Sequence, residues 1–325
     1  TKVYGRYANR LGIDKTRPWD LLNNQNTFSL PAIKAFDSEE ELISKVGDIF
    51  NRLDPVLGGY YQTMRENQLF DLMNRKGKGP GAFCTSFATV GKPFIFMNAT
   101  GMSTDVQVLF HESGHGFHNF EIFNLPYHHQ WRTDMEFAEV ASTAMELLAE
   151  PYLAEDRGGF MSVEDAARTR LLNLEGNLLF WPYMAVVVAF QHWVYENHEE
   201  GKTPSACDAK WSSLVDEYMP GVDWEGYEDV KMTGWHRKLH IHQLPFYYIE
   251  YGLASLGAFQ IMKNALQDQA KAIEDYRHAL ALGGTVSLPD LYSASGANLS
   301  FDAQTLGEVV NMIEENLADL ETKLD

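Results

Sequence analysis

Hydrophobic and polar residues follow two different periods along this chain, one typical of helices and one typical of strands. The helical period, with apolar residues three or four positions apart, dominates the sequence after residue 133. Glycine and proline residues interrupt it, and the segments between them are the predicted helices: 136–150, 163–195, 207–218, 244–274 and 306–324. Residues 37–76 predict two more helices, with breaks near Asp54-Pro55 and Gly58-Gly59. The pattern therefore predicts a mainly α protein.

A strand pattern occurs just before the first of the long central helices. Residues 82–90 and 93–98 are rich in β-branched and aromatic side chains and flank a short turn at Gly91-Lys92, which predicts a hairpin. An edge strand of such a hairpin can pair with an extended peptide, although a purely structural ribbon is equally compatible with the sequence. We expect one domain over 1–325, in which 1–104 combines helices with this β element and 105–325 is helical.

Composition narrows the class of protein. The chain has 325 residues, 45% of them hydrophobic, which is enough for one large core or two lobes around a cleft. Its 45 acidic and 26 basic residues give a formal charge of −19, which argues against nucleic acid or an anionic membrane surface as a partner. No feature of the sequence indicates an oligomeric state. The sequence predicts a globular protein whose field would mildly favour neutral or cationic peptides over acidic ones.

The most apolar segment and the two cysteines indicate in which cellular compartment the protein is expected. Residues 178–194 are interrupted by polar residues and a proline, and fall short of the roughly 20 clean apolar residues that a membrane span needs. This segment is therefore predicted to be a buried helix. Only Cys84 and Cys207 occur, so the sequence predicts neither a disulfide framework nor a thiolate metal cluster. We expect a reducing, cytoplasmic compartment and an unreactive, buried Cys84 thiol.

Candidate chemistry appears in residues 106–120, which contain the motif His-Glu-x-x-His at His111, Glu112 and His115. At about 3.6 residues per turn, the two imidazoles leave the same face of a helix and can bind one Zn²⁺ ion. Glu112 points about 100° away, where it can reach a water molecule beside the metal. A chance occurrence of the motif is the alternative, but its large apolar neighbours argue against exposed, incidental histidines.

A third metal ligand must come from outside this motif. His118 lies about 10 Å along the helix axis from His111, too far to share a tetrahedral ion, so it is expected to lie behind the site or in the core. Position 121 is a glutamate, which excludes the metzincin pattern. The next predicted helix offers Glu139 and Glu146 on one face, about two turns apart, and Glu136 nearer its start. A solvated acidic face is the ordinary alternative.

These blocks resemble the thimet oligopeptidase and oligoendopeptidase F family of metallopeptidases. The similarity extends over most of the chain and includes, in order, residues 17–20, 81–84, 93–96, 111–120, 137–143, 189–193, 240–254 and 288–292. Several separated blocks in the same order are more specific than one pentapeptide. The resemblance implies a gluzincin-type catalytic domain, mainly α, with a small β element lining the cleft. It also implies an additional helical N-terminal part, and this chain is expected to begin inside that architecture.

The resemblance further implies the roles of individual residues. Zinc would be held by His111, His115 and Glu139, with Glu112 as the general base. His240, Tyr248 and Tyr251 would stabilise the oxyanion, because a protonated tyrosine hydroxyl donates a hydrogen bond without carrying charge.

Neighbouring residues have less defined roles. Tyr247 is expected to point elsewhere and to be structural, whereas His242 departs from the apolar residue expected there. The predicted function is zinc-dependent hydrolysis of internal bonds in short oligopeptides. A non-catalytic zinc-binding scaffold and a carboxypeptidase-type exopeptidase are the alternatives.

Overall fold

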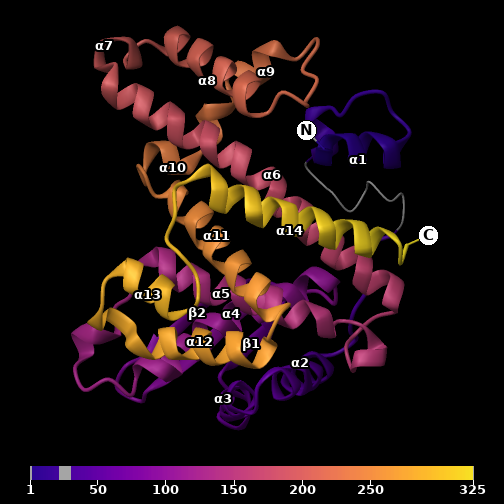
Figure 1. Ribbon diagram of the computed structural model, residues 1–325, viewed down its shortest axis with the longest axis vertical. Coiled ribbons are helices and arrows are strands. Elements are labelled where there is room, and N and C mark those ends of the chain that lie inside the picture. The colour runs from indigo at the N-terminus through magenta and orange to yellow at the C-terminus, as the bar shows by residue number, and fades with distance from the viewer. Residues whose placement is uncertain (1, 22–30, 325) are drawn as a thin grey trace. The chain divides into compact units, whose positions relative to one another are not determined.

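The computed structural model describes residues 2–21 and 31–324, and helices make up most of it (Figure 1). The helices are α1 (Lys2–Leu11), α2 (Glu39–Leu53), α3 (Pro55–Glu66), α4 (Ser103–Ile122), α5 (Met135–Ala149), α6 (Val163–Glu196), α7 (His198–Gly201), α8 (Pro204–Tyr218), α9 (Glu228–Met232), α10 (Leu239–His242), α11 (Tyr248–Ala265), α12 (Gln269–Leu282), α13 (Leu288–Ala294) and α14 (Ala303–Glu321). Three strands, β1 (Phe70–Met73), β2 (Phe83–Phe87) and β3 (Lys92–Ala99), form one small sheet. The prediction of a mainly α fold with a small β element is confirmed.

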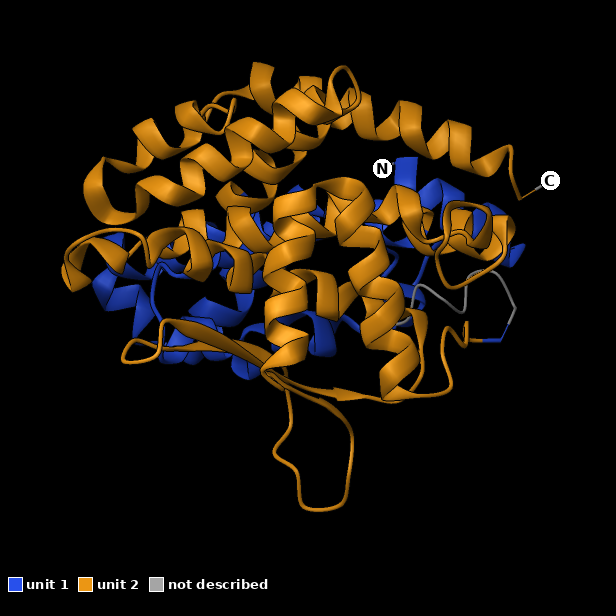
Figure 2. Ribbon diagram, turned by 90° about the horizontal axis from the view of Figure 1, so that it is seen from below, with its two compact units in different colours: residues 1–31, 172–252 blue, residues 32–171, 253–325 orange. Residues whose placement is uncertain are grey.

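The chain divides into two compact units, coloured separately in Figure 2. Unit 1 comprises Thr1–Pro31 and Leu172–Gly252, and unit 2 comprises Ala32–Leu171 and Leu253–Asp325. Each unit is therefore assembled from two separate stretches of sequence. Both α6 and α11 contribute residues to both units.

In unit 2, short polar side chains set the helix boundaries. The Asp54 carboxylate accepts hydrogen bonds from the backbone N–H groups of Val56 and Leu57, at 2.9 and 3.0 Å, and so caps α3. Pro55 occupies the first turn, where its missing N–H costs nothing. The predicted break at Asp54-Pro55 is confirmed. The break expected at Gly58-Gly59 is wrong, because both glycines lie inside α3.

The sheet has the strand order β1-β3-β2. β2 and β3 form the predicted antiparallel hairpin, and Gly91 in its turn has φ +61°, a conformation that favours glycine. β1 adds a parallel strand that the local pattern did not predict. Alternate residues of β3 are buried, including Ile95 and Met97, which places its apolar face inward. β2 is left as an edge strand.

Aromatic packing joins α4 to α2 in the core of unit 2. The ring of Phe50 lies 5.7 Å from that of Phe110 and 4.8 Å from that of Phe117, measured between centroids, and all three side chains are fully buried. Edge-to-face contacts of this kind add to the free energy gained from burial alone. They hold α4 by its apolar side, so that its polar side faces α5.

The core of unit 1 is built around the second part of α6. Val186, Val187 and Phe190 of this helix pack with Trp211 of α8 and Tyr248. By length and composition alone, α6 could also cross a membrane. Its most apolar 18-residue stretch has a mean hydropathy of 1.3, and 39% of that stretch is buried. A core helix of a soluble protein meets the same criteria, so this is weak evidence for a span.

The predicted helix 244–274 is wrong as a single element. α11 begins only at Tyr248, after the turn that contains Pro245, and it ends at Ala265. α12 then starts at Gln269, where the Asp268 carboxylate accepts a hydrogen bond from the backbone N–H of Lys271. The apolar period continued across both boundaries, but proline and an aspartate cap decided them.

Candidate metal centre and oxyanion residues

The motif histidines lie on α4, one turn apart and on the side that faces α5. The His111 and His115 rings are 5.1 Å apart between centroids and nearly perpendicular, at 85°. The start of α4 is fixed by Asp105, whose carboxylate accepts backbone N–H groups from Thr100, Gly101 and Met102 at 2.7 to 2.9 Å. The N-terminal end of the helix that carries the motif is therefore firmly held.

Gly114 allows α4 and α5 to approach each other closely. A Cβ atom at this position would lie 2.6 Å from the carbonyl oxygen of Ala141 and 2.7 Å from the Cα atom of Ser142. Both distances are far shorter than real Cβ contacts, and the atoms in the way belong to the backbone. Any larger residue would push the helices apart. The glycine inside the motif thus sets the distance at which α5 presents its carboxylates.

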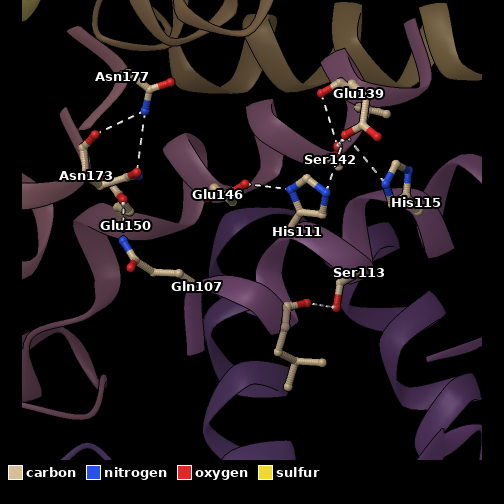
Figure 3. A network of polar contacts seen from close by, with 12 residues as sticks. Gln107, His111, Ser113, His115, Glu139, Ser142, Glu146, Glu150, Asn173 and Asn177 are labelled. Carbon is tan, nitrogen blue, oxygen red and sulfur yellow. Dashed lines mark hydrogen bonds and ion pairs between the residues drawn. The ribbon is translucent and has the colours of Figure 1, made fainter. Parts of the chain in front are cut away.

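The structure brings His111, His115 and Glu139 together (Figure 3), with candidate ligand atoms within 4.8 Å of one another. An oxygen of Glu139 lies 3.4 Å from Nε2 of His111 and 3.8 Å from Nε2 of His115. Four ligands around a tetrahedral Zn²⁺ at about 2.0–2.1 Å stand roughly 3.3 Å apart. Two imidazoles and a carboxylate at this spacing therefore fit a zinc ion.

Two side chains orient this group. The hydroxyl of Ser142 donates to an oxygen of Glu139 at 2.9 Å. The Nδ1 atom of His111 lies 2.6 Å from an oxygen of Glu146, so that Nε2 is turned toward Glu139 (Figure 3). Glu146, which the sequence left open as a ligand, lies behind His111 instead. Glu136 is not part of the group among the described residues.

Without a metal, the charges of the two histidines differ. Burial alone would lower the pKa of His111, but hydrogen bonds to Glu139 and Glu146 raise it to about 10. Burial and the nearby charge of His111 lower the pKa of His115 to about 4. Glu139 is partly buried, which alone would raise its pKa, yet both histidines hold that pKa below the usual value. The histidine in contact with both carboxylates is therefore the one favoured to carry a proton.

Glu112 lies beside this group in a largely apolar setting. Its side chain is 6% exposed, and burial raises its pKa to about 7, against the opposing effects of His111 and of a hydrogen bond from the Cys84 backbone. One carboxylate oxygen, Oε2, has no hydrogen-bond partner among the described residues. The backbone contact with Cys84 ties Glu112 to the edge strand β2. Burial also raises the pKa of the Cys84 thiol, as expected of an unreactive cysteine.

His118 is a core residue. It is 4% exposed, its Nε2 atom lies 3.3 Å from the hydroxyl of Thr133, and its ring meets that of Phe137 edge-on. Burial, with a smaller effect from His115, lowers its pKa to about 3. It is therefore neutral at physiological pH and lies outside the candidate metal group, as its spacing predicts.

The predicted oxyanion residues lie together in unit 1. The His240 ring is 4.8 Å from the ring of Tyr248 and 6.0 Å from that of Tyr251, and the two tyrosine rings are 5.9 Å apart. Tyr248 is 7% exposed, and burial is the main cause of its raised pKa, so its hydroxyl stays protonated. Tyr251 is less buried. The Tyr248 phenol therefore remains a hydrogen-bond donor at neutral pH.

The turn ahead of α11 sets the direction of these tyrosines. Phe246 has φ +62°, a left-handed conformation that is strained for an aromatic residue. The expectation that Tyr247 points elsewhere is wrong, because its ring lies 5.5 Å from Tyr251 and stacks on His240 at 5.9 Å. His242 is exposed, and its Nε2 atom lies 3.3 Å from the carbonyl oxygen of Trp235.

One neighbour of this group was missed by reasoning from sequence. The ammonium of Lys238 lies 3.6 Å from the centroid of the Tyr248 ring, and burial followed by repulsion from Arg237 lowers its pKa to about 8. A lysine against an aromatic face forms a cation–π contact. No pattern of spacing marks such a contact, because it depends on how the loop before α10 folds back.

Comparison with known proteins decides the family. A family model described as peptidase family M3 matches residues 2–309. The chain belongs to peptidase family M3. The predicted family is thereby confirmed, and with it the class of fold.

Individual relatives agree with this membership. An oligoendopeptidase F homologue of Borreliella burgdorferi is 25% identical over 82% of this chain and 45% of its own length. Oligopeptidase PepF of Bacillus subtilis is 25% identical over 80% of the chain and 38% of its own length. A solved structure of PZ peptidase A with an inhibitor has a TM-score of 0.85 and 30% identity, over 99% of this chain and 56% of that one. The chain thus spans about half the length of the proteins it matches.

Proposed function

We propose that this chain carries the catalytic site of a zinc-dependent endopeptidase that hydrolyses internal bonds of short oligopeptides. The observation that carries the proposal is the grouping of two imidazoles and a carboxylate beside a buried, partly unsatisfied Glu112, in a member of peptidase family M3. Relatives named oligoendopeptidase and oligopeptidase support the choice of substrate class.

His111, His115 and Glu139 would hold the metal, since their spacing and donor types suit zinc. When bound, zinc would supply Lewis acidity, which polarises the scissile carbonyl and makes a water molecule more acidic. Glu146 would keep the His111 ring in the tautomer that offers Nε2 as a ligand. Ser142 would hold one oxygen of Glu139 in place.

Glu112 would act as the general base and then as the general acid. Its carboxylate accepts a proton from the attacking water and passes it to the leaving amine. Burial, which raises its pKa to about 7, suits a group that must both take up and release a proton near neutrality. The backbone N–H of Cys84 would keep the carboxylate turned toward the reacting atoms.

Tyr251 and His240 would donate hydrogen bonds to the oxyanion that forms during attack, with Tyr248 as their partner. Their mutual ring contacts support a shared role. The substrate would lie extended along β2, the edge strand of the sheet, where backbone groups are available for pairing. A cytoplasmic setting is part of the proposal, supported by two free cysteines.

A peptide-cleavage assay tests the proposal. The purified chain is incubated with a mixture of short peptides, with and without a chelator, and the cut positions are read by mass spectrometry. Internal cuts that disappear with the chelator and return with added zinc are the expected result. Stepwise removal of C-terminal residues would indicate an exopeptidase instead. Bound zinc without any cleavage would contradict the proposal in favour of a scaffold.

A further inference from the structure

Unit 1 contains a cavity of about 560 Å³ whose lining includes none of the residues proposed above for catalysis or metal binding. Its walls come mainly from α6, α8 and α9, which Figure 1 labels, and from the short 3₁₀ segment Pro18–Leu21. Six aromatic side chains line it: Trp19, Phe180, Tyr183, Trp211, Trp224 and Tyr227. Trp19 and Tyr227 meet edge-on, 5.1 Å apart between centroids, and are 48% and 44% exposed. A cavity of this size with aromatic walls suits a small planar, apolar group.

Two buried donors of this lining lack a partner. The hydroxyl of Tyr183 and the Nε1 atom of Trp224 are shielded from solvent, and neither makes a hydrogen bond to any described residue. An indole N–H can only donate. Because a buried, unsatisfied donor is costly, an occupant that offers acceptor oxygens would be favoured over a purely apolar one.

The charges at the cavity are unequal. Lys231 is already neutralised, since its ammonium lies 2.8 Å from both carboxylate oxygens of Asp216. Arg237 is exposed and has no acidic partner among the described residues. An exposed arginine with no carboxylate beside it is available to pair with an anion. The guanidinium fork matches a carboxylate in two hydrogen bonds.

We propose that this cavity binds an aromatic carboxylate. The aromatic ring of the ligand packs between the walls, Arg237 pairs with the carboxylate, and the Tyr183 and Trp224 donors bind the lone pairs of the carboxylate oxygens that the arginine leaves free. Arg237 would repel an aromatic amine, so an amine does not fit although cations can bind aromatic faces. The proposal does not depend on zinc or on Glu112.

The same chemistry has two sources, a free aromatic acid or the C-terminal aromatic residue of a peptide. N-acetyl-L-phenylalanine represents the first and Gly-Gly-Phe the second. The tripeptide is tested in the Glu112→Gln variant, which prevents turnover during the measurement. Tighter binding of the tripeptide would assign the site to peptide ends, and tighter binding of the single residue to free acids. Either result supports an aromatic carboxylate site.

Isothermal titration calorimetry provides the test. N-acetyl-L-phenylalanine is expected to bind with a dissociation constant of about 1 mM or lower. N-acetyl-L-phenylalaninamide, which keeps the ring and lacks the charge, should bind about 10-fold more weakly. Arg237→Gln should remove the preference for the acid over the amide and weaken binding of the acid by about 10-fold.

Conservative variants separate the contribution of the two hydrogen-bond donors to binding from the contribution of aromatic packing. Tyr183→Phe and Trp224→Phe each remove one donor and keep an aromatic ring, and each should weaken binding by about 3- to 10-fold. Tyr195→Phe is the matched control, because Tyr195 is 62% exposed and lies outside the cavity lining. Near-ultraviolet circular dichroism checks that each variant keeps its tertiary structure.

Equal affinity for the acid and the amide, or unchanged affinity in Arg237→Gln, would overturn the proposal. So would the absence of binding by all three probes. If sedimentation then showed a dimer that Trp224→Phe weakens, the cavity would belong to a second copy of the chain.

Discussion

His111, His115 and Glu139 stand on the regular helices α4 and α5, whereas His240, Tyr248 and Tyr251 stand where one short helix ends and another begins. The first group is fixed by backbone contact at Gly114, by Ser142 and by Glu146. The second follows a strained Phe246 and is held by ring contacts. In the proposed function, the helical group presents metal ligands, which can be assayed without substrate. The second group would act only on the transition state, so only turnover would report on it.

Among the variants that compare these two groups, the largest effect is expected from removing the proposed third metal ligand. Glu139→Gln replaces a charged ligand with a neutral amide and should lower zinc affinity by at least about 100-fold, with activity lost in step. Zinc per chain after dialysis measures it. Glu136→Gln, on the same helix, is the matched control and should keep its zinc. The reverse pattern would show that the ligand is misassigned.

Tyr251→Phe should act on turnover alone. Loss of one oxyanion donor lowers kcat by about 100-fold, while zinc content and KM stay close to the original values. Steady-state kinetics on a quenched peptide gives both constants. Tyr247→Phe removes a neighbouring hydroxyl and should change kcat far less. If the two variants fell equally, the hydroxyl of Tyr251 would have no special role.

Glu146→Gln tests whether Glu146 orients the His111 ring rather than binding the metal itself. Its carboxylate lies 2.6 Å from Nδ1 of His111, so its loss should weaken zinc binding by about 10- to 100-fold, less than the loss of Glu139. Competition with a chelator of known affinity measures the difference. Equal losses in the two variants would erase the distinction between a ligand and its orienting partner.

His118→Asn is expected to have the smallest effect, on stability and not on metal binding. The pKa of His118 falls from its usual 6.5 to about 3 in the folded state, so the folded protein binds fewer protons and loses stability as pH falls from about 6.5 toward 3. The variant should be less stable at pH 7 by about 1–3 kcal/mol. Its free energy of unfolding should also fall less between pH 7 and pH 5 than that of the unmodified protein.

Melting temperatures of chelator-treated protein at the two pH values test this. His115, whose pKa is also lowered, keeps part of the acid sensitivity in the variant. A variant with unchanged pH dependence, or with reduced zinc content, would contradict the assignment of His118 to the core.

Local sequence patterns predicted the helices that carry the candidate metal site, because spacing on one helix fixes which side chains share a face. Those patterns placed Glu139 and Glu146 together on α5 and left both as possible ligands. Which of the two glutamates reaches the candidate metal group depends on the distance between α4 and α5, and Gly114 sets this distance through backbone contact. Only a three-dimensional structure gives that distance.

The segment around Tyr251 was harder to predict from local patterns. The apolar period ran on through Pro245, whereas the chain adopts a positive φ at Phe246 and starts a new helix at Tyr248. Local patterns also failed to predict the parallel pairing of β1 with β3 and the cation–π contact of Lys238. Both join residues that are not neighbours in a periodic pattern. Resemblance to a family supplied the roles that spacing could not.

The most direct test of the metal site and its base is Glu112→Gln, assayed for zinc content and peptide hydrolysis in the same preparation. The substitution keeps the shape of the side chain and removes its ability to accept a proton. The expected result is one zinc per chain, as in the unmodified protein, with kcat lowered by about 1,000- to 10,000-fold. Hydrolysis at the original rate would contradict the role of Glu112, and loss of zinc would contradict its place outside the ligand set.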